Sequence, residues 1–527
     1  MIVAAHPLAV QAGHEIFRKG GNAADAAIAV QFALAVVYPR AGNIGGGGLM
    51  VLRNAEGQTD ALDFREKAPL AASVSMYLDS LGQVVPDLSL KGHLASGTPG
   101  TVAGMVEAHR KYGRLKDFGE LLIPAIRLAE KGFPISESEA GRLNLYQAEF
   151  LQCNTAPNPY AVSRTWKTGD LLLQPELART LKRIRKEGPD GFYKGETARL
   201  IVGEMERGKG ILTREDLDAY EAVWRRPLTG QYKNYRIISM PPPSSGGVAL
   251  LQLLGILEHY AIKPGDLATR HLLIEAMRRV YADRAEYLGD PDFFSVPLDS
   301  LLDEGYLAGR MSNFSPDSAT YSRNTQWGDF SVRLEHFETT HTSVVDAEGM
   351  AVAITTTLNS NYGNKVVVGG AGFFLNNEMD DFSIKPGEPN QFGLVGGEAN
   401  AIAPGKRMLS SMTPTIVEKD GLLHLVLGSP GGSTIITSNL QVILNVIEFD
   451  MPLPEAVAAP RLHHQWLPDE VWIEKGRFSP EELKLLTMKG HRLVEKDRLG
   501  VVKAIQVFPD GRRCGAGDPR NPDDHAQ

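Results

Sequence analysis

The stretch Glu338-Thr339-Thr340-His341-Thr342-Ser343-Val344-Val345-Asp346 joins two parts of the chain that differ in character. Residues 311–338 are polar and lack sustained apolar periodicity, whereas a strand pattern begins abruptly at the threonines. A polar lead-in that ends at a hydroxyl residue suggests a precursor that cuts itself. The Thr339 hydroxyl would attack the carbonyl of Glu338 and break the chain through an ester, which leaves Thr339 with a nucleophile and a free amine. Ordinary strand propensity of threonine is the alternative interpretation.

Two β-branched runs predict a hairpin directly after this stretch. Residues 342–346 and 350–358 flank Asp-Ala-Glu-Gly, which is a turn signal. The tightest pairing places Thr339 opposite Thr356, and a one-residue bulge places it opposite Thr357. A packed core has little use for many hydroxyl groups at one strand end. Either register gathers the following polar side chains around the Thr339 amine: Thr355, Thr356, Thr357 and Asn359.

A second hairpin is predicted where residues 412–418 and 422–427 flank Asp420-Gly421. Extending its ladder brings a serine pair onto a glycine-rich segment: Ser410 opposite Gly431, and Ser411 opposite Pro430. Paired serines can donate hydrogen bonds to a carboxylate, and a Gly-Gly backbone can turn two N–H groups onto a developing oxyanion. A glycine-rich loop that merely turns is the alternative.

Further elements follow from apolar periodicity and from turn residues. Helices are predicted over residues 7–37 with a break at 20–22, and over 122–131, 248–257, 267–287 and 480–489; strands are predicted over 49–53, 59–64 and 366–376. A strand, not a helix, follows the glycine run at residues 42–48, and no Lys-Ser/Thr follows it either. The run therefore fails as a phosphate-binding loop and predicts close backbone packing instead.

The bulk composition bounds the class of protein. The chain has 527 residues, 43% hydrophobic and 22% charged, which allows a large buried core. A formal net charge of −8 argues against nucleic acid and against an anionic membrane surface as partners. No apolar run approaches the roughly 18–20 residues of a membrane span. Cys153 and Cys514 lack metal-ligand spacing and imply no disulfide framework.

Several ordered sequence blocks, spread over nearly the whole chain, resemble those of the γ-glutamyltranspeptidase family of N-terminal-nucleophile hydrolases. The blocks are Asp63-Phe64-Arg65-Glu66, Ser96-Gly97-Thr98-Pro99-Gly100, Met240-Pro241-Pro242-Pro243-Ser244-Ser245-Gly246-Gly247, Tyr287-Leu288-Gly289-Asp290-Pro291, Thr339-Thr340-His341, Asn376-Asn377-Glu378-Met379-Asp380-Asp381-Phe382, Leu409-Ser410-Ser411-Met412 and Gly428-Ser429-Pro430-Gly431-Gly432. The resemblance implies an α+β fold of the four-layer αββα sandwich type. It also implies cleavage into a large subunit, residues 1–338, and a small subunit, residues 339–527, that share one core, with 311–338 as a mobile segment before the cut.

The resemblance also implies the catalytic residues. Thr339 would be the nucleophile, and its α-amine, with an ordinary pKa of roughly 7.7–8.0, would take the hydroxyl proton. Thr357 matches the family residue that orients this amino terminus. The N–H groups of Gly431 and Gly432 would hold the oxyanion, each worth roughly 2.7–4 kcal/mol of barrier. The product would be a γ-glutamyl-threonine ester that passes its acyl group to water or to an amino acid or peptide.

Substrate recognition is implied to fall into two charged subsites. The α-carboxylate of a γ-glutamyl donor such as glutathione would be bound by Arg65, Ser410 and Ser411. The α-ammonium would be bound by Asn359, Glu378 and Asp381. The chain departs from many relatives at two places. Phe392 stands in the predicted lid where a gating tyrosine is common, and Met408 replaces a proline that would restrict the backbone before the serines.

Two rival functions follow from the same residues. The first is a glutaryl-type (cephalosporin) acylase on the same scaffold, which would have no ammonium to place between Glu378 and Asp381; an unpartnered carboxylate pair against a methylene would be costly. The second is a non-enzymatic binding protein whose precursor is never cut, which the retained Thr339 and Gly431-Gly432 disfavour.

We expect no cofactor and no metal, because His463 and His464 lack a third ligand and the family uses none. The first residues, Met1 to Pro7, lack a basic region followed by an apolar one and do not read as a signal peptide. Members of the family are usually exported. The protein is therefore expected to be periplasmic or extracellular if a signal was removed, and cytoplasmic otherwise.

Overall fold

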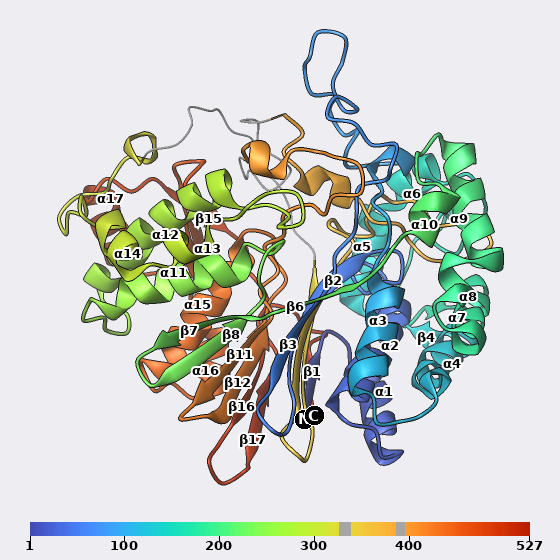
Figure 1. The fold of residues 1–527 in the computed structure, drawn as a ribbon, viewed down its shortest axis with the longest axis horizontal. Coiled ribbons are helices and arrows are strands. Elements are labelled where there is room, and N and C mark those ends of the chain that lie inside the picture. Colours follow the sequence, from blue (N-terminus) through green and yellow to red (C-terminus); the bar gives the residue numbers. More distant parts are fainter. Residues whose placement is uncertain (326–338, 386–395) are drawn as a thin grey trace.

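Two large antiparallel sheets pack face to face between two helical layers in the computed structural model, which describes residues 1–325, 339–385 and 396–527 (Figure 1). The first sheet has the order β18 (His525–Ala526), β1 (Ile2–Ala4), β9 (Thr340–Val345), β10 (Ala351–Thr357), β2 (Gly47–Arg53), β3 (Thr59–Phe64) and β6 (Val223–Arg225). The second has the order β17 (Arg513–Ala516), β16 (Lys503–Val507), β12 (Leu422–Gly428), β11 (Thr415–Lys419), β8 (Tyr235–Ser239) and β7 (Leu228–Tyr232).

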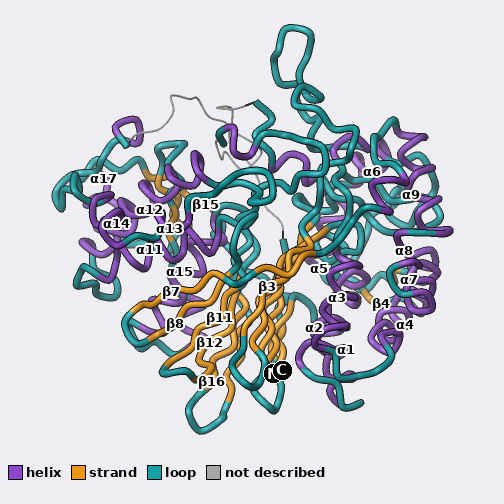
Figure 2. Tube along the Cα trace, in the orientation of Figure 1, coloured by secondary structure: helices purple, strands orange, loops and turns teal. Residues whose placement is uncertain are grey.

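Helices lie to both sides of the sheets, as the tube in Figure 2 shows. The helices on the side of the first sheet are α1 (Pro7–Arg18), α2 (Ala23–Val37), α3 (Thr101–Tyr112), α4 (Ile123–Lys131), α5 (Glu137–Leu145), α6 (Gln147–Cys153), α7 (Pro175–Glu187), α8 (Asp190–Tyr193), α9 (Gly195–Gly208) and α10 (Arg214–Asp218). Those on the side of the second sheet are α11 (Gly246–Glu258), α12 (Leu267–Tyr287), α13 (Leu298–Leu301), α14 (Glu304–Arg310), α15 (Thr434–Ile447), α16 (Leu453–Ala458) and α17 (Pro480–Met488).

Smaller elements complete the described chain. A three-stranded sheet contains β13 (Leu462–His463), β14 (Val471–Glu474) and β15 (Leu493–Lys496), and a two-stranded sheet contains β4 (Phe133–Pro134) and β5 (Leu171–Leu172). Single 3₁₀ turns are η1 (His93–Ala95), η2 (Phe118–Leu122), η3 (Ser322–Asn324), η4 (Glu378–Asp381) and η5 (Glu398–Asn400).

Strand alternation divides the apolar residues between three buried layers. In β2, Met50 and Leu52 pack toward the helices of the first layer, whereas Leu49 and Val51 pack between the sheets. The second sheet contributes Ile416 to the same inter-sheet core. Successive side chains of a strand point to opposite faces, so a sheet covered on both sides needs apolar residues at both parities. The four-layer αββα sandwich expected from the sequence is therefore the observed fold.

Both sheets contain strands from before and after residue 339. In the first sheet, β9 pairs with β1 and β10 pairs with β2. In the second sheet, β11 pairs with β8. The chain segments on either side of Thr339 consequently share one core, and neither has a complete sheet of its own. The division into subunits 1–338 and 339–527 stays a prediction.

The glycine run before β2 permits close backbone contacts, as the sequence predicted. A Cβ at Gly45 would lie 2.1 Å from the carbonyl oxygen of Phe374, and one at Gly46 would lie 2.1 Å from that of Thr357. Thr357 is itself a candidate site residue, and Phe374 lies four residues before Glu378, which is another. The adjacent helix α2 is buried along its whole length and begins at a capping box between Asn22 and Asp25.

Most predicted elements are observed. Helix α12 spans the predicted residues 267–287, α4 ends before Gly132, and α17 covers 480–488. The predicted strand at 366–376 is wrong, because the described chain there contains only one bridge, between Val367 and Phe374. Its glycines reverse the chain: Gly370 and Gly372 have φ values of 78° and 79°.

No helix in the described residues is long and apolar enough to cross a membrane. Cys153 and Cys514 are both free thiols.

We expect Gly45→Ala to destabilise the protein, because the new methyl group would collide with backbone rather than with a flexible side chain. Overpacking of this kind costs about 1–3 kcal/mol, which should lower the midpoint of urea unfolding. Gly141→Ala is the matched control, since nothing lies within 4 Å of its Cβ position on α5. That control should be neutral or stabilising by about 0.5–1 kcal/mol. Equal midpoints for Gly45→Ala and wild type would contradict the expectation.

Candidate active site

Thr339 immediately precedes β9, an interior strand of the first sheet. Thr340 pairs with Thr356, so the same register places Thr339 opposite Thr357. The other predicted register, with Thr356 opposite Thr339, is wrong. The reason lies in the turn, where the Asp346 carboxylate accepts the N–H groups of Glu348 and Met350 at 3.0 Å and holds a three-residue loop.

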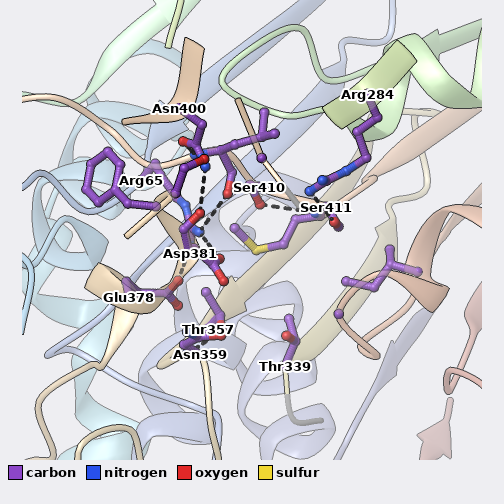
Figure 3. Close-up of a pocket in the computed structure, with 17 residues that line it drawn as sticks. Arg65, Arg284, Thr339, Thr357, Asn359, Glu378, Asp381, Asn400, Ser410 and Ser411 are labelled. Atoms are coloured by element: carbon purple, nitrogen blue, oxygen red, sulfur yellow. Dashed lines mark hydrogen bonds and ion pairs between the residues drawn. The ribbon is translucent and has the colours of Figure 1, made fainter. Parts of the chain in front are cut away.

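One cavity gathers nearly all the predicted site residues that the structure describes (Figure 3). With its open mouth included, it encloses about 550 Å³ of empty space. The predicted residues that line it are Arg65, Thr339, Thr357, Asn359, Glu378, Asp381, Ser410, Ser411 and Gly432. Gly431 lines a neighbouring cavity on the other side of the glycine pair. Glu338 and Phe392 lie outside the described residues, so the cleavage bond and the lid stay predictions.

Arg65 forms the centre of a buried ion cluster. Its Nη1 donates to Glu378 Oε2 at 2.6 Å, and its Nη2 donates to Asp381 Oδ2 at 2.5 Å. Glu66 Oε2 lies 3.3 Å from Nη1. The sequence assigned Arg65 to one end of a substrate and the two acids to the other; in this structure the guanidinium and the acids contact one another directly.

Burial, together with the excess of acid, shifts the pKa values of the members of this cluster. Burial, opposed by Arg65, raises the pKa of Glu66 to about 7. Burial together with the neighbouring carboxylates raises the pKa of Glu378 well above its usual value, and burial also raises that of Asp381. Burial lowers the pKa of Arg65, but the three carboxylates outweigh it and the net shift is upward. The cluster thus favours an additional positive charge.

Three carboxylate oxygens of the cluster have no hydrogen-bond donor among the described residues. They are Glu66 Oε1, Glu378 Oε1 and Asp381 Oδ1, and all three are buried. Leaving a buried charged acceptor unpaired is costly, so each such atom calls for an explanation. A ligand ammonium placed against Glu378 and Asp381 would supply the missing donors.

Thr357 and Asn359 lie at the end of β10, beside Thr339. The Thr357 hydroxyl accepts the N–H of Asn359 at 2.7 Å. Asn359 adopts a left-handed conformation with φ of 73°, which asparagine tolerates better than most residues, and its Nδ2 donates to the Asn377 carbonyl at 3.0 Å. No described residue donates to the amide oxygen of Asn359, so this atom can accept from a donor in the cavity.

The serine pair reaches the cavity by a different route from the predicted one. β11 begins only at Thr415, and a bulge interrupts its ladder with β12, so the predicted pairing of Ser410 with Gly431 is wrong. Ser410 instead pairs in parallel with Ser244, and its N–H donates to the Pro243 carbonyl at 2.9 Å. The proline-serine block at 240–247 therefore positions the serines. The Met408 carbonyl accepts a hydrogen bond from Arg65 Nε at 3.4 Å, and the Met408 side chain is buried.

The Gly431-Gly432 pair leads into the N-terminus of α15. Their φ values are 134° and 52°, and a Cβ at Gly431 would lie 2.6 Å from Thr434 Oγ1. Neither glycine N–H donates to an acceptor in the described part of the chain. Free N–H groups beside a helix N-terminus stabilise negative charge, which is the property an oxyanion hole needs.

The sequence did not reveal two polar residues that shape the cavity, Asn400 and Arg284. Asn400 donates to the Asp381 carbonyl at 2.7 Å and accepts from the Leu409 N–H at 2.9 Å. Arg284 lines the wall and donates to Ser245 and Ser411. The one signal that could have pointed to Arg284 was its position three residues before the family block at 287–291. The sequence predicted only a helix there and did not show which residue Arg284 would contact.

Histidines elsewhere form structural contacts. His463 is buried and hydrogen-bonds to Thr437 and Gln465. His271, Glu275 and His491 place three ligand-type atoms within 4.8 Å of one another. However, His271 Nδ1 and His491 Nε2 share a hydrogen bond of 2.7 Å, and Arg278 and Arg279 both pair with Glu275. Two guanidinium groups disfavour a cation at this place.

The fold and the site together define an N-terminal-nucleophile hydrolase. A model of the Gamma-glutamyltranspeptidase family matches residues 9–527. The chain is 48% identical over 529 residues to the glutathione hydrolase proenzyme of Escherichia coli (strain K12), with 99% of this chain and 91% of that protein covered.

Two solved structures are also similar. The structure of a cephalosporin acylase from Bacillus halodurans superposes on this one with a TM-score of 0.86 and 26% sequence identity. The match covers 99% of this chain and 94% of the acylase chain. The structure of Helicobacter pylori gamma-glutamyltranspeptidase matches with a TM-score of 0.57 and 46% sequence identity. This match covers 60% of this chain and 91% of the Helicobacter chain. The chain belongs to the γ-glutamyltranspeptidase family.

We expect Arg65→Lys to raise the KM for a γ-glutamyl anilide by about tenfold or more. Lysine keeps the charge but loses the planar fork that spans Glu378 and Asp381, and one charge-assisted hydrogen bond is worth about 1.5–3 kcal/mol. Cleavage at Thr339 should stay intact. Arg53→Lys is the matched control. Arg53 is also buried, its Nε lies 2.7 Å from Glu418 Oε1, and this ion pair is not part of the cavity. An unchanged KM for Arg65→Lys would mean that this arginine is only structural.

Proposed function

We propose that the protein is a self-processing γ-glutamyltranspeptidase that cleaves glutathione and related γ-glutamyl compounds. The observation that carries the proposal is the cavity itself. It places Thr339, immediately before β9, together with Gly432 and with two buried acids that each have one oxygen without a donor among the described residues. The acyl group would pass to water or to an amino acid or peptide.

Processing would begin with attack of the Thr339 hydroxyl on the carbonyl carbon of Glu338. The peptide bond shifts to an ester as the hydroxyl proton moves to the departing amide nitrogen. Water then hydrolyses the ester, which leaves a carboxylate on Glu338 and a free α-amine and hydroxyl on Thr339. The two products, residues 1–338 and 339–527, would remain a heterodimer, because strands from both parts build both sheets.

Turnover would repeat the same chemistry on an external substrate. The Thr339 amine takes the hydroxyl proton while the oxygen attacks the γ-carbonyl carbon, and the N–H groups of Gly431 and Gly432 hold the resulting oxyanion. Collapse expels the leaving amine, which receives the proton, and leaves a γ-glutamyl ester on Thr339. Water or an acceptor amine then attacks the ester and regenerates the hydroxyl.

Donor recognition would depend on the ion cluster. The α-ammonium would bind between Glu378 and Asp381 with the amide oxygen of Asn359, and the α-carboxylate would bind near Arg65, Ser410 and Ser411. A glutaryl chain, the substrate of the acylase alternative, carries hydrogen in place of the ammonium. It would leave the acid oxygens unpaired, which disfavours that alternative although an acylase shares the fold.

We expect the purified wild-type protein to give two bands on a denaturing gel, with the new N-terminus at Thr339. Thr339→Ala should stay a single band because the attacking hydroxyl is gone. Thr340→Ala is the matched control: it removes a neighbouring buried hydroxyl that has no hydrogen-bond partner in the described chain, and it should still be cut. If Thr339→Ala is cut at the same bond, an external protease is responsible and self-processing is refuted.

We expect a γ-glutamyl anilide to be preferred over the matched glutaryl anilide by about 10- to 100-fold in kcat/KM, since charge-assisted hydrogen bonds are worth about 1.5–3 kcal/mol each. The preference should rise with pH through about 7. Below their raised pKa values, Glu66, Glu378 and Asp381 bind protons and lose the charge that attracts an ammonium. The Thr339 amine titrates in both assays, so its contribution cancels in the ratio.

Asp381→Asn should reduce this preference and flatten its pH dependence, chiefly by weakening the γ-glutamyl donor. Asp292→Asn is the control, because Asp292 does not line the cavity and its carboxylate pairs with Arg225 at a distance of 2.8 Å. Equal use of the two anilides by the wild type, or preference for glutaryl, would replace the transpeptidase with the acylase.

A further inference from the structure

Arg284 is a buried cation in the wall of the cavity, and the proposed mechanism does not use it. It lies near the C-terminal end of α12 and is 5% exposed. Its Nε donates to Ser245 Oγ at 2.9 Å, and its Nη2 donates to Ser411 Oγ at 3.1 Å. Figure 3 shows the side chain reaching Ser411 from the side opposite Arg65.

Arg284 differs from the other buried arginines in having no acidic partner among the described residues. Each of the others forms an ion pair: Arg40 with Glu139, Arg53 with Glu418, Arg65 with Glu378, Arg278 and Arg279 with Glu275, Arg407 with Asp63, and Arg461 with Asp518. A buried charge without a counter-ion is costly, and burial lowers the pKa of Arg284 accordingly. An anionic ligand in the cavity would provide the missing counter-ion.

The direction of the hydrogen bonds shows where such an anion would bind. A guanidinium only donates, so Ser411 Oγ accepts from Arg284 and keeps its own proton for another acceptor. Ser410 Oγ accepts from the Met412 N–H at 3.1 Å and keeps its proton in the same way. Ser245 links the two, because it accepts from Arg284 and donates to the Ser410 carbonyl at 2.7 Å. Two serine hydroxyls beside one cation suit a carboxylate.

Arg65 alone is a poor anchor for that carboxylate. Three acids surround it at 2.5–3.3 Å, so the cluster has one positive charge against three potential negative ones. An approaching anion would be repelled by the acids as well as attracted by the arginine. Arg284 adds a positive charge on the far side of the serines, where no acid of the described chain pairs with it.

We propose that Arg284 is a further specificity-determining residue of this site, which positions the Ser411 hydroxyl and supplies the positive charge for the α-carboxylate of the donor. The proposal rests on the proposed function, because it assumes a γ-glutamyl donor. The ammonium end of the donor would bind the Arg65 cluster, and the carboxylate end would lie between Arg65 and Arg284. The separation of two opposite charges would orient the γ-carbonyl toward Thr339.

The test compares three donors on wild type and on Arg284→Gln. They are L-γ-glutamyl-p-nitroanilide, its α-carboxamide, and L-γ-glutamyl-3-carboxy-4-nitroanilide. We expect Arg284→Gln to lower kcat/KM for both α-carboxylate donors by about 10- to 100-fold, mainly through KM, and to change the α-carboxamide by less than about threefold, because its neutral amide gains little from the charge. Arg270→Gln on the same helix is the control, since Arg270 pairs with Glu482 outside the cavity.

Two results would overturn the proposal. Equal losses for the carboxylate and carboxamide donors would assign Arg284 a structural role, and a loss confined to the carboxylated anilide would assign it to the leaving group. If Arg284→Gln does not fold or process, Arg284→Lys decides: it keeps the charge but loses the fork, so it should raise KM for α-carboxylate donors alone by about 3- to 10-fold. Failure of the proposed function is distinguishable, because the wild type would then release no anilide from any donor.

Discussion

The pairing of β9 between β1 and β10 is the constraint on which the site depends. This ladder fixes Thr340 opposite Thr356 and so holds Thr339 at the sheet end beside Thr357. A shift of one residue would turn every side chain of β9 to the other face and bury different residues against the helices. The Asp346 carboxylate prevents that shift by holding the turn with two hydrogen bonds to backbone N–H groups. The position of the nucleophile is thus determined at the opposite end of its strand.

Electrostatics then determine what the cavity can hold. The Arg65 cluster is rich in acid and has three carboxylate oxygens without donors in the described chain. Arg284 has a positive charge that no acid among the same described residues pairs with. The two unbalanced regions lie on either side of the serine pair (Figure 3). A zwitterion with its ammonium near Glu378 and its carboxylate near Ser411 would balance both. A molecule with only one of the two charges would leave the other region unpaired and bind less well.

Close backbone packing allows these groups to meet. Gly45 and Gly46, just before β2, let the chain pass close to the carbonyls of Phe374 and Thr357. The Asn376 side chain donates to both the Gly45 and the Gly97 carbonyls at 2.9 Å. Asn376 lies two residues before the turn that carries Glu378 and Asp381. The glycine run is therefore linked through Asn376 to the turn that carries the acid pair, and a larger residue at Gly45 would collide with the Phe374 carbonyl.

The sequence by itself determined the local elements and the chemical groups. The bounds of α12 and α4 were predictable because apolar periodicity and a glycine stop are properties of neighbouring residues, and the family blocks identified Thr339, Arg65 and the serines. Only the tertiary structure decided which of these groups touch. Arg65 meets Glu378 from 313 positions away, Ser410 is held by Ser245 from 165 positions away, and Arg284 reaches Ser411 from α12, which is 127 positions away. Such contacts depend on how two sheets and their helices stack, and no local pattern records that packing.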